Sequence, residues 1–284
     1  MKKFAMIFIL FLITGCATVS APAVTVEPDP EPTVTEPTVT EPTVIEPTVT
    51  EAPSVELDWD RDPETLVIQV AASGGGSASN AALINQLFVS QVWGDGRIVW
   101  TTWADDYNDY GDYQRYVWQG QLSEAEMTTL LETFADKGFF RMKARYAPDE
   151  NVLDGGTTRL SVHLLSREKV VSEYFYGAPD GFHELIDLLT SGAGVEATPY
   201  VPQSGQLDAI EAPDYMAEGE YPIWDATALG LDLHDAARVW VEGDALLTAW
   251  EVVNQSSFFP IVVQDGSYFE LYLRLPEIGV MAIQ

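Results

Sequence analysis

Residues 104–116, ADDYNDYGDYQRY, bring together the side chains of this chain that are best suited to form a binding site. Acidic and amide side chains alternate there with tyrosines around one glycine. Oxygen ligands of this kind bind Ca²⁺, and tyrosines offer an apolar ring with a polar hydroxyl. We therefore predict a binding loop next to Trp103 that consists of Asp105, Asp106, Tyr107, Asn108, Asp109, Tyr110, Asp112 and Tyr113.

The spacing within this loop does not fit an EF-hand. Counted from Asp106, the third position is Asn108 and the sixth is Gly111, as required. The fifth position is Tyr110 and the twelfth is Val117, where the motif needs an acidic ligand and a bidentate glutamate. A turn between two strands explains the same composition. We predict no metal or cofactor, and a looser Ca²⁺ site stays open as an alternative.

The sequence assigns no catalytic residue. The histidines His163, His183 and His234 have no partner at the spacing of a zinc motif. Ser77 lies in GGGSASN, which lacks the strand–turn–helix context of a serine nucleophile. The many carboxylates single out no glycosidase pair. The residues therefore favour binding over catalysis.

The elements that would position these residues follow from periodicity and turn signals. Ser123 and Glu126 form a capping box that opens a helix, and Gly138 ends it. Asp180 is expected to cap a second helix. Strands are predicted at residues 65–72, 86–93, 97–103, 113–121, 157–165 and 169–176. The order β-β-β-β-α-β-β-α predicts an α+β fold, an antiparallel sheet with two helices on one face.

Aromatic residues alternate along two of the predicted strands. Trp100 and Trp103 point to opposite faces of the sheet, and Tyr116 and Trp118 share one face. One face must pack on the helices, so an aromatic row on the other face could bind a sugar or a peptide. Coverage of that face by a linker or a second domain is the alternative.

The chain is expected to continue beyond this α+β domain, assigned to residues 62–192. Residues 193–213 contain three prolines and little periodicity, which predicts a linker. Residues 214–284 predict a small acidic α+β domain with a helix at 245–253 and a hairpin at 261–263 and 267–275.

The N-terminus carries an export signal. Two lysines precede the apolar run FAMIFILFLI at residues 4–13, which is too short to span a bilayer. The run ends in Ile13-Thr14-Gly15-Cys16, which resembles the lipobox of bacterial lipoproteins. The resemblance implies removal of a signal peptide, residues 1–15, by cleavage between Gly15 and Cys16. It also implies acylation of Cys16, a membrane anchor and, in a cell with two membranes, sorting to the outer membrane.

Residues 16–61 are predicted to form a disordered stalk. EPTVT recurs from residue 31 to residue 50, and regular prolines with repeated glutamates favour an extended chain. The 38 residues from 21 to 58 could reach roughly 120 Å at about 3.1 Å per residue. The formal net charge of −30 argues against a nucleic-acid partner.

A second resemblance covers roughly residues 64–284. Its landmarks are DGRIVW at 95–100, QGQLSEAEMTTLL at 119–131, DGGTTRLSVHL at 154–164 and LYLRLPEIG at 271–279. Together they resemble a widespread set of uncharacterised secreted bacterial proteins with Pro/Thr-rich stalks. We expect an exported, lipid-anchored envelope protein that displays a non-enzymatic binding module to an unknown extracellular ligand or protein. The alternatives are an envelope hydrolase that acts on glycan or peptide, and a purely structural surface protein.

Overall fold

The computed structural model describes residues 56–74, 89–103, 114–150, 152–213, 220–255 and 259–278. The chain divides into two units at Glu51/Ala52, and every described residue belongs to the second unit, Ala52–Gln284. The predicted signal peptide, Cys16 and the stalk as far as residue 55 lie outside the described residues. In the part of the chain that the structure describes, no helix has the length and hydropathy needed to cross a membrane.

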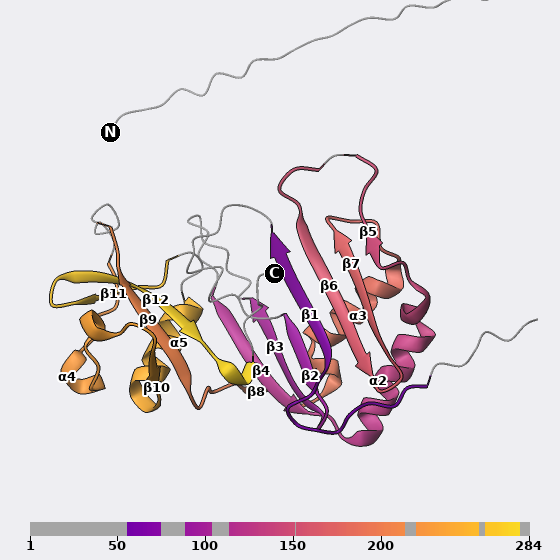
Figure 1. Ribbon diagram of the computed structural model, residues 1–284, viewed down its shortest axis with the longest axis horizontal. Coiled ribbons are helices and arrows are strands. Elements are labelled where there is room, and N and C mark those ends of the chain that lie inside the picture. Colours follow the sequence, from indigo (N-terminus) through magenta and orange to yellow (C-terminus); the bar gives the residue numbers. More distant parts are fainter. Residues whose placement is uncertain are drawn as a thin grey trace, which may run out of the picture. The chain divides into compact units, whose positions relative to one another are not determined.

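The larger sheet has eight strands in the order β5-β7-β6-β1-β2-β3-β4-β8 (Figure 1). Its neighbouring strands are antiparallel, as predicted, except for β5 and β7, which are parallel. Strand β5 was not predicted, because its two residues are too few for an alternating pattern to show. The strands are β1 (Leu66–Gly74), β2 (Ser90–Trp93), β3 (Arg97–Trp103), β4 (Arg115–Gln121), β5 (Arg145–Tyr146), β6 (Gly156–Leu164), β7 (Arg167–Tyr174) and β8 (Thr198–Pro199).

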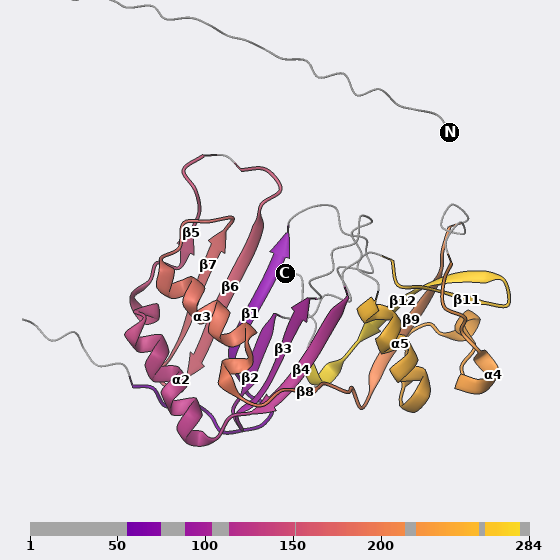
Figure 2. The same ribbon diagram turned by 180° about the vertical axis from the view of Figure 1, so that it is seen from behind.

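Two helices cover one face of this sheet, as predicted. Figure 2 shows α2 (Glu124–Asp136) and α3 (Asp180–Thr190) lying across the sheet. Their apolar sides, including Leu131, Phe134 and Phe182, form one core cluster with sheet residues such as Ile68 and Ile98. The α+β fold class is therefore confirmed.

The two helices begin differently. In α2 the predicted capping box is present: the Ser123 amide donates to Glu126 Oε2 at 2.7 Å, and Ser123 Oγ accepts from the Glu126 amide at 3.3 Å. In α3 the prediction of Asp180 as the cap is wrong, because Pro179 holds the N-cap position and Asp180 is the first helical residue. Asp180 still carries a carboxylate in the first turn, where the helix dipole favours negative charge.

Replacing Ser123 with alanine is expected to lower the free energy of unfolding by about 1 kcal/mol at neutral pH. Hydrogen bonds from the Ser123 hydroxyl and amide lower the pKa of Glu126, so the part of the contribution that depends on this carboxylate is present above the ordinary pKa of 4.5 and is lost as pH falls through the lowered pKa. The bond from the Glu126 amide to Ser123 Oγ does not change with pH. Urea titration of wild type and variant at pH 7 and pH 3 measures both effects. Ser123→Thr, which keeps a hydroxyl, is the control, and an equal loss at both pH values would contradict this interpretation.

The fold begins earlier than the predicted end of the stalk at residue 61. Trp59 is only 3% exposed, and its Nε1 donates to the Gly94 carbonyl at 3.0 Å. The amide of Leu165 donates to the Asp58 carbonyl at 2.9 Å, which ties the same segment to the end of β6. The stalk boundary was misplaced because a single tryptophan in the acidic run LDWDRD gives no periodic signal.

The second sheet has the order β10-β9-β12-β11. It contains the predicted hairpin, and the predicted helix at 245–253 lies within α5. The elements are β9 (Gly205–Glu211), α4 (Ala226–Leu229), β10 (Val239–Val241), α5 (Gly243–Gln255), β11 (Ile261–Gln264) and β12 (Ser267–Arg274). Short 3₁₀ turns occur at η1 (Phe139–Arg141), η2 (Gly192–Gly194), η4 (Leu233–Asp235) and η5 (Pro276–Ile278).

The predicted linker at 193–213 is wrong over much of its length. It contains β8 and also β9, which pairs with both β10 and β12. Leu207 is fully buried, and a side chain at Gly205 would collide with Leu246 and Leu273. Prolines on both sides of this strand hid it, because tertiary pairing rather than local pattern defines it.

A second core cluster is shared by both sheets. It combines Val99 and Val117 of the larger sheet with residues of β9, α5 and β12, such as Leu207, Val253 and Leu271. Arg115 in β4 also donates from Nη2 to the Val253 carbonyl at 2.9 Å. The helix-free face of β2–β4 is therefore largely occupied by packing against the second sheet.

Candidate functional site

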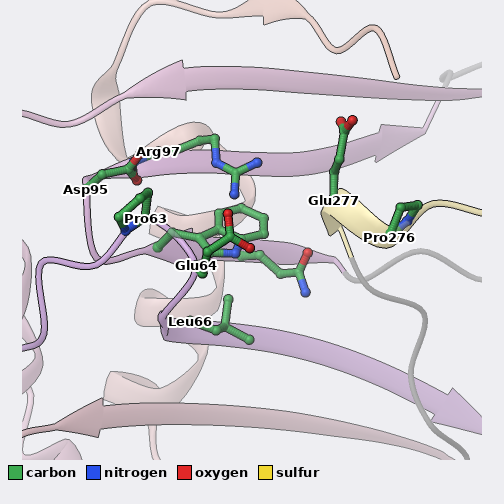
Figure 3. A pocket seen from close by; sticks show the side chains of 9 residues that line it. Pro63, Glu64, Leu66, Asp95, Arg97, Pro276 and Glu277 are labelled. Carbon is green, nitrogen blue, oxygen red and sulfur yellow. Dashed lines mark hydrogen bonds between the residues drawn. The ribbon is translucent and has the colours of Figure 1, made fainter. Parts of the chain in front are cut away.

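A cleft of about 500 Å³ opens beside the helix-free face of the larger sheet (Figure 3). Its walls come from the segment before β1 and the first residue of β1, from β2, from the β2–β3 turn and the start of β3, and from η5 near the described end of the chain. The described residues that line it are Pro63, Glu64, Leu66, Gln91, Trp93, Asp95, Arg97, Pro276 and Glu277.

Strand alternation and one tight turn place the central side chains. Gln91, Trp93 and Arg97 point toward the cleft. Ile98, the next residue after Arg97 in β3, points to the other face of the sheet and packs in the core under the helices. The Arg97 amide donates to Asp95 Oδ1 at 3.0 Å across the turn. Gly96 has φ of +85°, and a Cβ there would come within 2.2 Å of the Leu122 carbonyl oxygen. The turn therefore requires glycine, and its geometry fixes the start of β3.

Arg97 is held in the cleft by an aromatic ring. Its guanidinium carbon lies 4.0 Å from the centroid of Trp93, which is a cation–π contact. Among the described residues, no carboxylate comes within 4.0 Å of this guanidinium, and its N–H groups have no hydrogen-bond partner. Trp93 therefore positions this positive charge, and no described residue forms an ion pair with it.

Arg61 offers a comparison within the same molecule. Its guanidinium carbon lies 3.9 Å from the centroid of Trp59, an almost identical stack. Yet Arg61 forms an ion pair with Asp58 and a second one with Glu124 at 3.3 Å. The contrast shows that an arginine stacked on tryptophan can still pair with carboxylates when they lie close to it.

Gln91 is a second polar group without a hydrogen-bond partner in the described part of the chain. Only 4% of the residue is exposed, and its side-chain amide makes no hydrogen bond to any described residue. It lines the cleft, so a ligand there could reach both its N–H and its carbonyl group.

Glu277 is positioned by Tyr200. The hydroxyl of Tyr200, a residue that is 5% exposed, donates to Glu277 Oε2 at 2.9 Å. Burial, followed by this bond to Glu277, raises the pKa of Tyr200 well above its usual value of 10, and the charge of Arg97 opposes the shift. The phenol therefore stays protonated as a donor, and it fixes a carboxylate on the wall of the cleft.

A neighbouring cleft of about 430 Å³ shares Arg97 with the first. Its other described lining residues are Gln119, Gly120, Gln121, Glu196 and Thr198, from β4 and the segment that leads into β8. Gln121 Nε2 donates to the Asp95 carbonyl at 2.6 Å, which ties this wall to the β2–β3 turn. Arg97 thus borders two clefts, and the second is lined by amide and hydroxyl groups and by the carboxylate of Glu196.

The predicted binding loop lies almost entirely outside the described residues, together with its Ca²⁺ alternative. Those residues are Asp105, Asp106, Tyr107, Asn108, Asp109, Tyr110, Asp112 and Tyr113. Trp103 is described; it lies at the end of β3 and is 54% exposed. Ser77 also lies in a part of the chain that the structure does not describe.

The possible aromatic row on β3 and β4 is not formed. Trp100 is 3% exposed and packs under the helices, and Trp118 packs partly against the same cluster. Trp103 and Tyr116 are exposed, but they lie on opposite faces of the sheet. The two core clusters explain this result, because each face of these strands needs apolar side chains.

The histidines have local partners. His183 Nε2 lies 3.0 Å from Glu173 Oε2, and His234 Nδ1 lies 2.9 Å from Asp232 Oδ1. His163 lies 3.9 Å from a glutamate of the next strand. Hydrogen bonds from Gln264 and His234 lower the pKa of Asp232 to about 2. No group of three or more His, Cys, Asp or Glu side chains within the described ranges could hold a metal ion.

Sequence reasoning missed Gln91, Trp93, Arg97 and Glu277 as site residues. A usable signal existed for two of them, since Trp93 and Arg97 flank a Gly-Asp-Gly turn, where residues on paired strands come together. Glu277 lies far away in sequence, and no local pattern connects it to that turn. Comparison of the chain with protein-family models, with curated proteins and with solved structures found no match.

Proposed function

We propose that this chain is a lipid-anchored cell-envelope protein that carries a non-enzymatic ligand-binding module on an extended stalk, and that the ligand occupies the Arg97 cleft. One observation carries the proposal: the cleft contains two polar groups, the guanidinium of Arg97 and the amide of Gln91, without partners among the described residues. Both are held by the β2–β3 hairpin, so the site is organised before a ligand arrives.

The composition of the cleft supports binding more than catalysis. Its described lining contains no histidine, cysteine, serine or threonine, so it offers no nucleophile paired with an imidazole base. A few polar groups in a concave, partly apolar space are typical of small-molecule sites, which usually have volumes of about 300–1,000 Å³.

The location rests on the N-terminal segment. The lipobox-like ending at Cys16 and the EPTVT repeats support an acylated, extended tether between the membrane and the folded unit. A binding module held away from the membrane in this way would sample ligands in the surrounding envelope or medium.

Thermal unfolding of the purified full-length lipoprotein in detergent tests the proposal. The probes are lysine, alanyl-alanine, cellotriose and tri-N-acetylglucosamine at millimolar concentration. A ligand present at about 100 times its dissociation constant stabilises the native state by about 2.7 kcal/mol, so a binding probe should raise Tm clearly.

Matched variants show whether such a shift comes from the cleft. Arg97→Ala and Gln91→Leu should abolish the increase in Tm, whereas Arg61→Ala, at the equivalent stack, should retain it. The proposal fails if no probe raises Tm, or if the increase survives in both cleft variants.

A further inference from the structure

We infer that the ligand of the Arg97 cleft is a zwitterion, an amino acid or short peptide with free ends, whose carboxylate is bound by Arg97 and whose ammonium is bound by Glu277. This inference rests on the proposed function and gives its ligand a chemical class. It follows from the charges in the cleft and from the partners that these charged groups already have. It also follows from the burial of Trp93, the only aromatic side chain among the described lining residues.

Arg97 selects a carboxylate. A guanidinium presents a planar set of N–H donors that matches the two oxygens of a carboxylate. Stacking on Trp93 uses a face of this plane and leaves the N–H edges available. The similar Arg61 stack shows the outcome when protein carboxylates are present, since Asp58 and Glu124 bind its guanidinium there.

The other charges in the cleft select a cation. Glu64, Asp95 and Glu277 supply three carboxylates against the single guanidinium of Arg97. Asp95 accepts the Arg97 amide and Glu277 accepts the Tyr200 hydroxyl, but neither contact neutralises a negative charge. A phosphate ester or a dicarboxylate would therefore meet net repulsion, whereas a ligand that also carries an ammonium group would be attracted.

The carboxylates enter the cleft from separate elements. Figure 3 shows Glu64 on the segment before β1 and Glu277 on η5, with Arg97 on β3. Glu277 is the carboxylate that we assign to the ammonium group, because the Tyr200 hydroxyl holds Oε2 in place and no hydrogen bond to a described residue uses Oε1.

The remaining groups fit a peptide. The buried amide of Gln91 can both donate to and accept from a peptide bond, and Leu66, Trp93 and the two prolines supply an apolar wall. The adjoining cleft of about 430 Å³, lined by amide and hydroxyl groups and by the carboxylate of Glu196, gives room for a longer chain.

The same geometry disfavours a sugar as the ligand. Sugar sites rely on an open aromatic face for stacking. Trp93 is only 6% exposed, and Arg97 already lies over its ring. A neutral sugar would also leave the guanidinium without a counter-charge.

Isothermal titration of the full-length lipoprotein with three dipeptides tests the inference. Alanyl-alanine carries both charges, N-acetyl-alanyl-alanine lacks the ammonium, and alanyl-alaninamide lacks the carboxylate. We expect saturable binding of alanyl-alanine and about tenfold weaker binding of each blocked peptide, because each loses one charged contact.

Two variants assign each charge to its residue. Arg97→Ala should weaken alanyl-alanine binding about tenfold and change alanyl-alaninamide binding less than about twofold. Glu277→Gln, whose amide oxygen can still accept from Tyr200, should weaken alanyl-alanine and leave N-acetyl-alanyl-alanine unchanged. Arg61→Ala is the control and should change none of the three affinities.

The outcomes separate this inference from the proposed function. Equal affinity for the free and blocked peptides would contradict the inference that the ligand is a zwitterion. Loss of binding of all three peptides upon either substitution would contradict it as well. If a sugar probe raises Tm in an Arg97-dependent manner and no dipeptide binds, the cleft is a binding site and the ligand class is wrong. If no probe binds in either experiment, both proposals fail.

Discussion

Replacing Trp59 with alanine is expected to lower the free energy of unfolding by about 3–5 kcal/mol. The residue is 3% exposed, belongs to the core under the helices, and donates from Nε1 to the Gly94 carbonyl. The substitution removes the ring from the core, leaves the Gly94 carbonyl without this donor and removes the platform on which Arg61 stacks. Urea or guanidinium titration followed by circular dichroism measures the loss.

Trp240→Ala is the matched control for this experiment. Trp240 lies in β10 and is 65% exposed, so its removal should change the free energy of unfolding by less than about 0.5 kcal/mol. An equally small change for Trp59→Ala would mean that the segment around residue 59 belongs to the stalk rather than to the fold.

Replacing Cys16 with serine is expected to abolish lipidation and membrane association of the folded unit. A serine hydroxyl cannot accept the thioether-linked lipid that the lipobox resemblance implies, and stable anchoring requires more than one acyl chain. Metabolic labelling with an alkyne fatty acid, followed by fractionation, measures both effects. The labelled band and the membrane-bound fraction should disappear together.

Deletion of residues 27–51 provides the control for the anchor. It retains Cys16 and removes the EPTVT repeats as far as Glu51 while leaving Ala52–Gln284 intact. This variant should label fully, partition with membranes and unfold at the wild-type temperature. Labelling of the Cys16→Ser chain would contradict the anchor, and a large fall in Tm of the deletion variant would contradict the stalk.

Much of the fold follows from local signals in the sequence. The bounds of β3 agree with the alternating run RIVWTTW, and the capping box sets the start of α2 at the residue expected. The elements that were missed depend on distant partners. β9 is recognisable only once β10 and β12 lie beside it, and Trp59 only once Gly94 approaches it.

The candidate site was harder to predict than the fold. Its residues come from separate segments, and Glu277 joins Arg97 only through packing near the described end of the chain. Nothing local marks Gln91, since a glutamine in a strand is ordinary until the fold shows that it lines a cleft and bonds to no described side chain or backbone group. The predicted loop at 105–113 was chosen for its composition, and composition does not report which side chains lack partners after folding.

The central claim is that the Trp93–Arg97 cleft binds a ligand, and indole NMR of the ¹⁵N-tryptophan-labelled protein tests it most directly. The chain has eight tryptophans, and Trp93→Phe and Trp59→Phe variants would assign the two stacked indoles. On titration with alanyl-alanine, the indole signal of Trp93 should shift saturably while that of Trp59 stays in place. A Trp93 signal that does not move, or that moves together with Trp59, would contradict the claim.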